Sequence, residues 1–470
     1  MTVFYHSTRG QAPELDLRGV TLAGLATDGG LYVPKTWPEF LPADIAALNG
    51  KSYLDIAQKV LKPFVTPSLN ETVLQRLLAQ AYSTFNDTSV TPLKQLDDRH
   101  WILELFHGPT IAFKDVAMQL LGLVFEHFLS QSSTRMTVVG ATSGDTGSAA
   151  ISALANRKNI DVFILYPKKG PSDIQRKQMT CVDAPNVHAI AIEGSFDDCQ
   201  DIVKTLFGNA GFREKYSLAA VNSINWMRIL AQMVYYFVAV ARLNGDKGGG
   251  TKPVSFAVPT GNFGNVYAAY AAMKCGLPVS KLAVASNKND ILTRFFTSGK
   301  MQTEGVQSTL SPSMDIQISS NFERLLFDLC GEKSAQLRGL MGQMRAEGKF
   351  EVSPVQLGMA RQIFTAARAD DDLTIKTIQD VYKESGYVLD PHSAVGVAAT
   401  RILERELPDP VISLACAHPA KFPETIQRAI GVTPELPDYV AALMSKKERT
   451  TLLPAEATAV EKFITSQVKL

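Results

Sequence analysis

Residues 137–167 read TVVGATSGDTGSAAISALANRKNIDVFILYP. The apolar runs at the two ends, 137–141 and 162–167, predict strands, and the small-residue run 149–158 between them predicts a helix. A strand, a helix and a second strand in this order predict two parallel strands joined by a right-handed crossover. This unit is typical of α/β proteins, in which helices cover a mainly parallel sheet.

The same order of elements recurs in the second half of the chain. VSFAVP (254–259) predicts a strand, VYAAYAAMKCG (266–276) a helix and LAVAS (282–286) the next strand. Further strands are predicted at WILELF (101–106), HAIAIEG (188–194) and VISLA (411–415), and a further helix at FDDCQDIVKTLFG (196–208). The chain is therefore expected to form α/β layers on parallel sheets.

We divide the chain into two α/β domains with a flanking segment at each end. The predicted parts are a mainly helical N-terminal segment (1–95), a large α/β domain (96–130 and 246–435), a small α/β domain (131–245) and a C-terminal helical tail (436–470). The glycine-rich run DKGGGTK (246–252) is predicted to be a linker, because it follows charged residues and not a strand.

Composition and charge exclude several classes of protein. Lys and Arg number 47 against 46 Asp and Glu, so the net charge of +1 gives no general attraction to nucleic acid or anionic membranes. The most apolar long stretch, 224–243, contains Arg228 and Gln232, so it predicts a buried helix and not a membrane span. The N-terminus lacks an apolar signal core, and the five cysteines form no CxxC pair. We therefore predict a cytoplasmic protein without a metal site.

One lysine stands between a Gly-Pro turn and a long apolar run, in HGPTIAFKD (107–115). The run that starts at Asp115 predicts a buried helix, so Lys114 is expected at its mouth. The positive end of the helix and the apolar surroundings both disfavour the ammonium, which lowers its pKa. Such a lysine is a candidate Schiff-base nucleophile. The alternative is an ordinary lysine that extends from the first helical turn into solvent.

Two glycine-rich loops follow predicted strands, where open parallel sheets bind their ligands. TGNFGN (260–265) lets several backbone N–H groups converge at the start of a helix, which predicts a phosphate nest. TSGDTG (142–147) offers hydroxyl groups as well as N–H groups, and suits a carboxylate or a second phosphate. Each loop taken singly is also compatible with a tight turn that caps a helix.

Two further motifs carry polar groups at predicted element ends. NSINWMR (222–228) opens the apolar helix, and its Asn and Ser residues are good caps, a role that alone would explain them. Arg228 is different, because a guanidinium in a helix that is apolar nearly all round needs an anionic partner, and its fork suits phosphate oxygens. In CAHPAKF (416–422), His418 is more typical of a structural histidine than of a catalyst, since no partner completes a triad.

Together these motifs resemble one family. They are DGGLYVP (28–34), HGPTIAFKD (107–115), ATSGDTGS (141–148), VNSINWMR (221–228), PTGNFGN (259–265) and AHPAKF (417–422). In this order and spacing they resemble the threonine synthases, pyridoxal-phosphate enzymes of fold type II in the tryptophan synthase β-like superfamily. The resemblance covers nearly the whole chain. It implies two parallel-sheet α/β domains with the cofactor pyridoxal 5'-phosphate in the cleft, plus the helical N-terminal segment.

The resemblance also implies roles for individual residues. Lys114 is expected to bind the cofactor as a Schiff base. The cofactor phosphate is assigned to Gly261, Asn262, Phe263, Gly264 and Asn265, and the vicinity of the ring hydroxyl to Asp145. The substrate's carboxylate and phosphate are assigned to Thr142, Ser143 and Thr146. Its phosphate is assigned to Ser223, Asn225 and Arg228, with Lys421 as a further cation.

The implied reaction converts O-phospho-L-homoserine and water into L-threonine and inorganic phosphate, the last step of threonine biosynthesis. Lys114 would take the Cα proton. Two anion sites beside a grip for a carboxylate suit this small-molecule substrate. We expect the protein to act as a monomer or weak homodimer.

One residue departs from the family pattern. Relatives typically read TAHPAKF, in which the threonine hydroxyl meets the pyridine nitrogen of the cofactor, whereas this chain has Cys416 at that position. A neutral thiol is only a weak donor or acceptor. The substitution therefore affects the strength of the contact with the nitrogen, and it supplies no carboxylate that would keep the nitrogen protonated.

The residues leave two alternatives open. One is another enzyme of the same superfamily, either a serine/threonine dehydratase or a phospho-lyase that stops at 2-oxobutyrate. Arg228 and Ser223 favour a phosphorylated substrate over that of a simple dehydratase. The other is a non-catalytic nucleotide-binding α/β protein in which Lys114 is structural.

Overall fold

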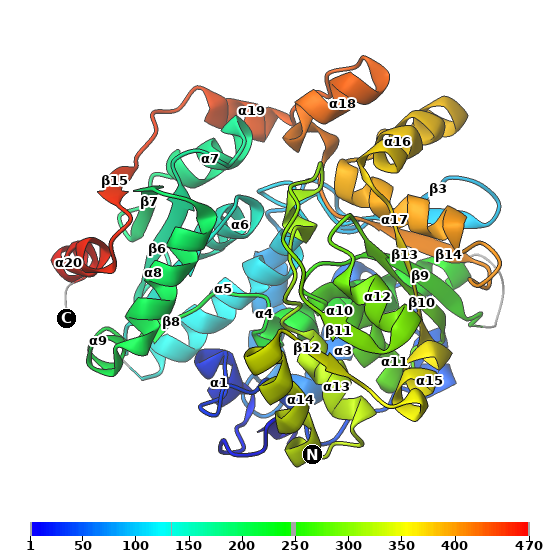
Figure 1. The fold of residues 1–470 in the computed structure, drawn as a ribbon, viewed down its shortest axis with the longest axis horizontal. Coiled ribbons are helices and arrows are strands. Elements are labelled where there is room, and N and C mark those ends of the chain that lie inside the picture. Colours follow the sequence, from blue (N-terminus) through cyan, green and yellow to red (C-terminus); the bar gives the residue numbers. More distant parts are fainter. Residues whose placement is uncertain (1, 133, 246–250, 469–470) are drawn as a thin grey trace.

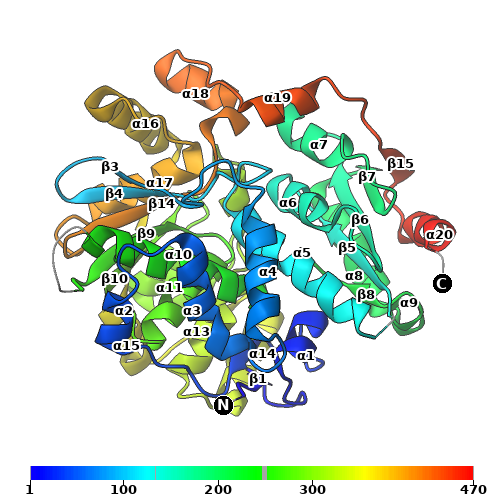
Figure 2. The same cartoon turned by 180° about the vertical axis from the view of Figure 1, so that it is seen from behind.

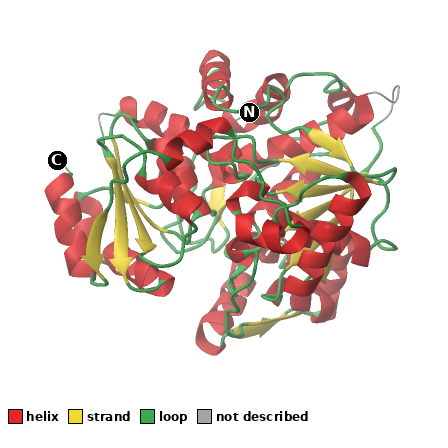
Figure 3. Cartoon of the chain, turned by 90° about the horizontal axis from the view of Figure 1, so that it is seen from above, coloured by secondary structure: helices red, strands yellow, loops and turns green. Residues whose placement is uncertain are grey.

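Two α/β units lie side by side in the structure, a computed structural model in which residues 2–132, 134–245 and 251–468 are described (Figure 1). Each unit is built on its own sheet, and Figure 3 shows the C-terminus beside the smaller sheet. Most of the predicted linker 246–252 lies outside the described residues. No helix in the described part of the chain has both the length and the apolar character needed to cross a membrane.

The larger sheet has six strands in the order β13-β10-β9-β14-β4-β3. All of its pairings are parallel except that of β3 with β4. Its strands are β3 (Leu93–Gln95), β4 (His100–Glu104), β9 (Val254–Pro259), β10 (Val279–Ser286), β13 (Phe364–Arg368) and β14 (Val411–Ala415). The four strands that the sequence predicted in this unit are therefore confirmed, while β3 and β13 were not predicted.

Helices cover both faces of this sheet. Those that follow the strands of the large unit, or pack beside them, are α5 (Lys114–Ser130), α10 (Trp226–Gly245), α11 (Gly264–Lys274), α12 (Ile291–Ser298), α13 (Phe322–Leu329), α14 (Ser334–Glu347), α15 (Pro354–Ile363), α16 (Asp371–Ser385), α17 (Pro391–Ile402) and α18 (Pro423–Ile430). Two 3-10 helices, η1 (Pro312–Met314) and η2 (Pro419–Lys421), and an antiparallel pair, β11 (Lys300–Gln302) with β12 (Lys349–Glu351), complete the unit.

The helix α10 is the buried helix that the sequence predicted, but it packs in the larger unit. Nearly all of its residues are buried, and its neighbours include α5, α11 and the N-terminal helix α3 (Tyr53–Val65) (Figure 2). A helix that is apolar all round needs cover on every side, and these helices provide it. We therefore propose that the small domain ends before α10, and not at residue 245.

The smaller sheet has five parallel strands in the order β15-β7-β6-β5-β8. Its strands are β5 (Met136–Ala141), β6 (Ile160–Pro167), β7 (Val187–Glu193), β8 (Leu218–Ala219) and β15 (Thr451–Pro454). Its helices are α6 (Asp145–Leu154), α7 (Asp173–Thr180), α8 (Phe196–Gly208) and α9 (Ala210–Lys215). The crossover from β5 through α6 to β6 confirms the unit predicted for 137–167, although α6 begins inside the glycine-rich loop.

The C-terminal segment is not a purely helical tail, and that prediction is corrected. After α19 (Asp438–Met444), the strand β15 pairs with β7 as the edge strand of the small sheet. The last helix, α20 (Ala457–Gln467), then buries Val460 and Ile464 against α8. Since the apolar face of α8 would otherwise be open to water, the C-terminal segment completes the core of the small unit.

The N-terminal segment is mainly helical, as predicted. It holds β1 (Tyr5–Ser7), α1 (Leu17–Ala23), β2 (Tyr32–Pro34), α2 (Pro42–Ala46), α3 and α4 (Glu71–Tyr82). The turn before β2 is tied to β1, because Asp28 accepts hydrogen bonds from the Ser7 hydroxyl (2.7 Å) and the Gly30 N–H (2.9 Å). A Cβ at Gly30 would lie 2.2 Å from Ser7 Oγ, so the glycine of the DGGLYVP motif leaves room for this turn.

The role of α20 can be tested with Ile464→Ala. Removing a fully buried isoleucine side chain typically lowers the free energy of unfolding by about 2–5 kcal/mol, so the urea midpoint of the small unit should fall clearly. Thr465→Ala, an exposed change on the same helix, should leave the midpoint nearly unchanged. Equal midpoints for the two variants would mean that α20 adds nothing to the core.

Candidate active site

Lys114 is the first residue of α5 and points into the protein. The preceding turn is locked to the helix, because the Thr110 N–H and hydroxyl both donate to the carboxylate of Asp115 at 2.7 Å. A Cβ at Gly108 would lie 2.5 Å from the Asp115 Cβ, so only glycine fits there. The Lys114 side chain is buried and its Nζ lies 3.5 Å from Asp145 Oδ2. The structure therefore excludes the alternative in which the Lys114 side chain extends into solvent.

Burial is the largest influence on the charge of Lys114, and it lowers the pKa of the amine. Among the charged neighbours, Asp145 raises this pKa, while Lys421 and Arg228 lower it. Burial would raise the pKa of the Asp145 carboxyl, but Lys421 and Lys114 hold it well below its usual range. Lys421 is the closer partner, with its Nζ 2.7 Å from Asp145 Oδ1. The lowered pKa predicted for Lys114 is thus supported, with burial as the main cause.

The loop 260–265 leaves β9 and starts α11, as predicted. Phe263 adopts a left-handed conformation with φ of 61°, and its N–H and those of Gly261 and Asn262 donate to no acceptor among the described residues. The hydroxyls of Tyr235 and Tyr236 donate to Asn265 Oδ1 and so orient the side-chain amide. Its Nδ2 is buried and has no hydrogen-bond partner within the described chain. A set of free donors at a helix start fits a phosphate group.

The second glycine-rich loop, 142–147, leaves β5 and opens α6. The Thr142 hydroxyl oxygen is buried and accepts from the N–H groups of Gly144 (3.0 Å) and Gly147 (2.9 Å), so it shapes the loop. Ser143 is exposed and Thr146 is half-buried, which leaves both hydroxyls accessible to a ligand. Of the three residues predicted to bind substrate here, Thr142 already has a structural role.

The start of α10 supplies a guanidinium without a partner. Arg228 is 3% exposed, and its Nε and Nη1 have no hydrogen-bond partner among the described residues. Burial lowers its pKa to about 10, so the group stays charged at neutral pH. A buried, charged and unpaired guanidinium is costly unless an anion joins it. This arrangement fits the anion site predicted for Arg228.

Ser223 and Asn225 have different surroundings. Ser223 is half-buried beside the loop 260–265, and its carbonyl accepts from the Asn321 amide at 3.2 Å. Asn225 was predicted to bind the substrate phosphate, but its Nδ2 donates to Thr21 O (2.9 Å) and its Oδ1 accepts from the Met227 N–H (3.0 Å). Asn225 therefore ties α1 to the start of α10, the capping role that the sequence left open.

The segment after β14 places Cys416, His418 and Lys421. Cys416 is buried, and burial raises the pKa of its thiol well above the usual range, which keeps it neutral. His418 Nδ1 accepts from the Ala420 N–H at 3.2 Å, so it is structural, as predicted. Lys421 is fully buried and also donates to Thr110 O at 3.0 Å. Lys421 is thus bound to Asp145 and to the turn before Lys114, and is not a free cation.

Two residues that the sequence did not predict hold together the loop 260–265 and the segment 222–225, which we call the anion loops. Asn321 Nδ2 donates to Ser223 O and to Asn262 O (3.1 Å), so it joins these two loops. Arg324 is fully buried and donates to Asn321, to Tyr32 O (3.0 Å) and to Ile224 O (2.7 Å). The reasoning applied to Arg228 does not find Arg324, because α13 also carries Glu323 and Asp328, which the sequence offers as anionic partners.

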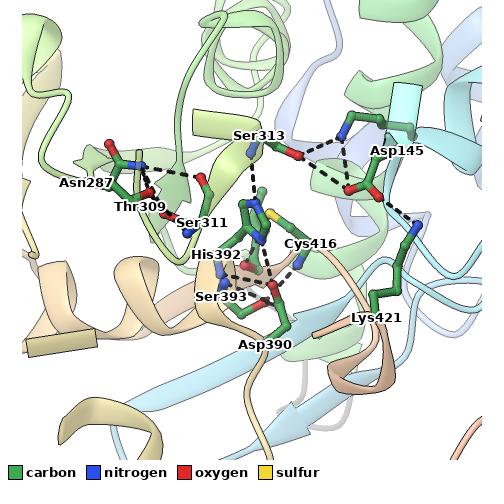
Figure 4. Close-up of polar contacts among 12 residues, drawn as sticks. Asp145, Asn287, Thr309, Ser311, Ser313, Asp390, His392, Ser393, Cys416 and Lys421 are labelled. Atoms are coloured by element: carbon green, nitrogen blue, oxygen red, sulfur yellow. Dashed lines mark hydrogen bonds and ion pairs between the residues drawn. The ribbon is translucent and has the colours of Figure 1, made fainter. Parts of the chain in front are cut away.

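A second group was also missed, formed by Ser313, His392 and Asp390 (Figure 4). Ser313 Oγ, on η1, lies 3.4 Å from Lys114 Nζ, and the Ser313 N–H donates to His392 Nε2 at 3.2 Å. His392 Nδ1 lies 3.0 Å from Asp390 Oδ1. No sequence motif marks these residues, since Ser313 and His392 are far apart along the chain.

Comparisons with known proteins cover the whole chain. Three family models match it: "Threonine synthase N terminus" over residues 4–82, "Pyridoxal-phosphate dependent enzyme" over 84–340 and "Threonine synthase, C-terminal" over 393–464. The threonine synthase of Pseudomonas aeruginosa is 48% identical, over 98% of this chain and 97% of that protein.

Solved structures agree. The pyridoxal-phosphate-bound threonine synthase of Brucella melitensis has a TM-score of 0.96 and 48% identity, covering 100% of both chains. The yeast threonine synthase has a TM-score of 0.94 and 41% identity, covering 99% of this chain and 98% of that one. These matches bear out the resemblance inferred from the six motifs.

The charge balance around Lys114 predicts a pH dependence. In the apoprotein, Lys114 should react with an amine reagent at lower pH than exposed lysines do, because burial lowers its pKa. Lys421→Met removes a nearby positive charge and frees Asp145 to pair with Lys114, so both effects should move the labelling profile of Lys114 to higher pH. Peptide mass spectrometry after labelling across a pH series measures this. A profile that stays in place would contradict the role of Lys421.

The bridge made by Asn321 predicts a loss of cofactor affinity. Asn321→Ala frees the loop 260–265 and the segment around Ser223 together, so the Kd for pyridoxal phosphate should rise about ten- to a hundredfold, as expected for the loss of 1.4–2.8 kcal/mol. Equilibrium titration by absorbance measures the Kd. Gln336→Ala, an exposed change on α14, serves as the control and should leave the Kd unchanged.

Proposed function

Because the chain belongs to the threonine synthase family, we infer that it is a pyridoxal-phosphate-dependent lyase that converts O-phospho-L-homoserine and water into L-threonine and inorganic phosphate. The observation on the chain itself that carries this function is the unpaired Arg228 guanidinium. It lies near a buried lysine and a separate phosphate nest, so the site offers one anion position for a cofactor and another for a substrate.

The residues present fit the cofactor. The free N–H groups of Gly261, Asn262 and Phe263, with the unpaired Nδ2 of Asn265, would hold its phosphate. Lys114 would hold its aldehyde carbon covalently. When bound, pyridoxal phosphate supplies an electron sink for the negative charge that develops at the substrate Cα.

Lys114 would act as the base of the reaction. Its lowered pKa favours a neutral amine, which can take the Cα proton at Nζ. The side chain of Asp145 lies beside Lys114 and is an ionised carboxylate, because Lys421 keeps its pKa low. Asp145 would therefore present an acceptor to the ring hydroxyl of the cofactor throughout the reaction.

Arg228 would bind the substrate phosphate through the two guanidinium nitrogens that have no hydrogen-bond partner in the described part of the chain. Ser143 is exposed, Thr146 and Ser223 are half-buried, and their hydroxyls would add hydrogen bonds to the substrate's phosphate and carboxylate. The neutral Cys416 thiol would meet the pyridine nitrogen without protonating it.

We further propose that the enzyme works in the cytoplasm as a monomer or weak homodimer. The five cysteines are free and buried, which fits a reducing compartment. Sedimentation at several protein concentrations would measure the oligomeric state.

Product analysis tests the proposed reaction. The holoenzyme is incubated with O-phospho-L-homoserine in water enriched in oxygen-18, and the products are examined by mass spectrometry. We expect L-threonine with the label in its hydroxyl group and phosphate without label, because the C–O bond breaks and water adds at Cβ. Formation of 2-oxobutyrate would instead identify a phospho-lyase, and homoserine with labelled phosphate would identify a phosphatase.

Arg228 distinguishes a phosphohomoserine enzyme from its dehydratase relatives. Arg228→Ala removes a desolvated charge pair worth about 2–5 kcal/mol, so kcat/KM for phosphohomoserine should fall by tens to thousands of fold. The absorbance of the bound cofactor should stay, since a separate loop holds the cofactor phosphate. Arg228→Lys should restore activity only in part, because the fork is lost.

Arg242→Ala is the matched control for this prediction. Arg242 lies in the last turn of the same helix and donates to the carbonyls of Thr91 and Ser89, so its loss should lower Tm with little effect on kcat/KM. If Arg228→Ala instead lowers Tm and cofactor retention together while phosphate release per holoenzyme is unchanged, Arg228 serves the fold and not the substrate.

A further inference from the structure

A hydroxyl that the reaction described above does not use lies beside the reactive amine. Ser313 Oγ is 3.4 Å from Lys114 Nζ and 3.4 Å from Asp145 Oδ2 (Figure 4). Among the described residues, these two side chains are its only hydrogen-bond partners. The hydroxyl therefore caps no helix and closes no turn, and its contacts are with the site alone.

The backbone of Ser313 is fixed by a buried histidine. The Ser313 N–H donates to His392 Nε2 at 3.2 Å, so that nitrogen must be unprotonated. The proton of a neutral imidazole then sits on Nδ1, which lies 3.0 Å from Asp390 Oδ1 and donates to it. His392 is 3% and Asp390 1% exposed. The carboxylate thus sets the histidine tautomer that can hold Ser313.

Asp390 is itself held firmly at the start of α17. It accepts from the N–H groups of His392 (2.9 Å) and Ser393 (3.3 Å), and the Ser393 hydroxyl also donates to it. The Ser393 Oγ in turn accepts from the Cys416 N–H at 2.9 Å. One helix start therefore fixes both the segment of Ser313 and the backbone of Cys416.

The segment of Ser313 is pinned on its other side as well. Asp315 accepts from the Thr309 hydroxyl (2.6 Å) and from the side-chain amides of Asn287 (2.8 Å) and Asn289 (3.0 Å), which follow β10. With Asp315 bound to the loop after β10 and Ser313 bound to His392, η1 is held from that loop and from the start of α17. The Ser313 hydroxyl consequently has a defined position relative to Lys114.

We propose that Ser313 is a further catalytic residue that orients the Lys114 amine through its hydroxyl, and that His392 and Asp390 are positioning residues for Ser313. A lysine amine that is not bound to the cofactor can rotate about four side-chain bonds, yet it must meet one Cα proton. A hydroxyl accepts from an ammonium and donates to a neutral amine, so it can hold Lys114 in both states without adding charge. The proposal rests on the proposed function of Lys114 as the base.

The first test compares Ser313→Ala with Ser313→Thr in the holoenzyme. Loss of the hydroxyl should lower kcat about ten- to a hundredfold, the scale of a catalytic group that is no longer held in place. KM for phosphohomoserine and the Kd for pyridoxal phosphate should change less than about threefold, because the anion loops are untouched. Ser313→Thr keeps the hydroxyl and should recover most of kcat. Ser298→Ala, an exposed change at the end of α12, is the matched control.

A second readout does not depend on turnover. The apoprotein is mixed with pyridoxal phosphate, and the rate of covalent capture by Lys114 is followed by absorbance and confirmed by borohydride trapping. Ser313→Ala should slow capture about tenfold, because the amine is less often oriented toward the aldehyde. If the wild-type protein captures the cofactor but makes no threonine, the proposed reaction fails while this comparison still tests Ser313.

The role of His392 is tested by a double-mutant cycle. His392→Leu removes the acceptor for the Ser313 N–H, whereas His392→Gln keeps an acceptor oxygen near the place of Nε2. We expect His392→Leu to resemble Ser313→Ala in kcat and capture rate, and His392→Gln to lie within tenfold of the wild type. The variant with both Ser313→Ala and His392→Leu should be no more than about threefold slower than the slower single variant, since both act through one bond.

Two results would overturn the proposal. Unchanged kcat and capture rate in Ser313→Ala would remove the role of Ser313, and with it that of His392. Multiplied losses in the double variant would show that His392 acts independently of Ser313. The Tm of each variant shows whether it has misfolded. His127→Gln, which replaces a histidine of α5 outside the site, is the control for this measurement. If His392→Leu has misfolded, the His392→Gln variant is used to test the role of His392.

Discussion

The site depends on one carboxylate that faces more positive charge than it can balance. Asp145 is paired with Lys421 and approached by Lys114, while Arg228 has no anionic partner in the described chain. Burying charges is costly unless they are compensated, so the ligand-free site carries an unfavourable excess of positive charge. Anionic ligands would remove that excess, so their binding would also stabilise the protein. Burial is the main cause of the lowered pKa of Lys114, and Lys421 and Arg228 add to it, so the cations that favour anion binding also favour the neutral amine.

Rigid elements from both sheets are needed to hold this charge arrangement. The large sheet delivers Lys114 after β4, the phosphate loop after β9 and the Cys416 segment after β14, whereas the small sheet delivers Asp145 after β5. Buried polar groups then fix two parts of the site, the anion loops and η1. Arg324 and Asn321 join the anion loops to the N-terminal segment, and the pair of His392 and Asp390 joins η1 to α17. The N-terminal segment is thus part of the support of the site, which explains why its DGGLYVP turn accompanies the binding motifs.

The sequence alone predicted the elements whose pattern is local. The strands before both glycine-rich loops, the buried helix α10 and the position of Lys114 follow from short-range periodicity and turn chemistry, so a single sequence reveals them. It could not reveal β15, because a four-residue strand is recognised only once β7 is beside it. Nor could it assign α10 to a domain, distinguish the capping role of Asn225 from a ligand role, or find Ser313, since each depends on contacts between distant segments. Arg324 was missed for another reason: Glu323 and Asp328 on its own helix offer anionic partners in the sequence, so its guanidinium did not stand out as that of Arg228 did.

The substitution at Cys416 shows why these supports matter. The backbone of Cys416 is held on both sides, because its N–H donates to Ser393 and its carbonyl accepts from the Phe113 N–H (2.7 Å), next to Lys114. The position of this segment therefore does not depend on which side chain meets the pyridine nitrogen. Lys114 and the loop 260–265 would fix the cofactor at two other points, so a weak thiol contact there has little influence on where the ring lies. If Cys416 meets the pyridine nitrogen as proposed, the thiol would change the hydrogen bond to that nitrogen, and hence how strongly the ring withdraws electrons from the substrate. On this proposal the residue at position 416 can be varied without rebuilding the site, because different groups would set the geometry and the electronics.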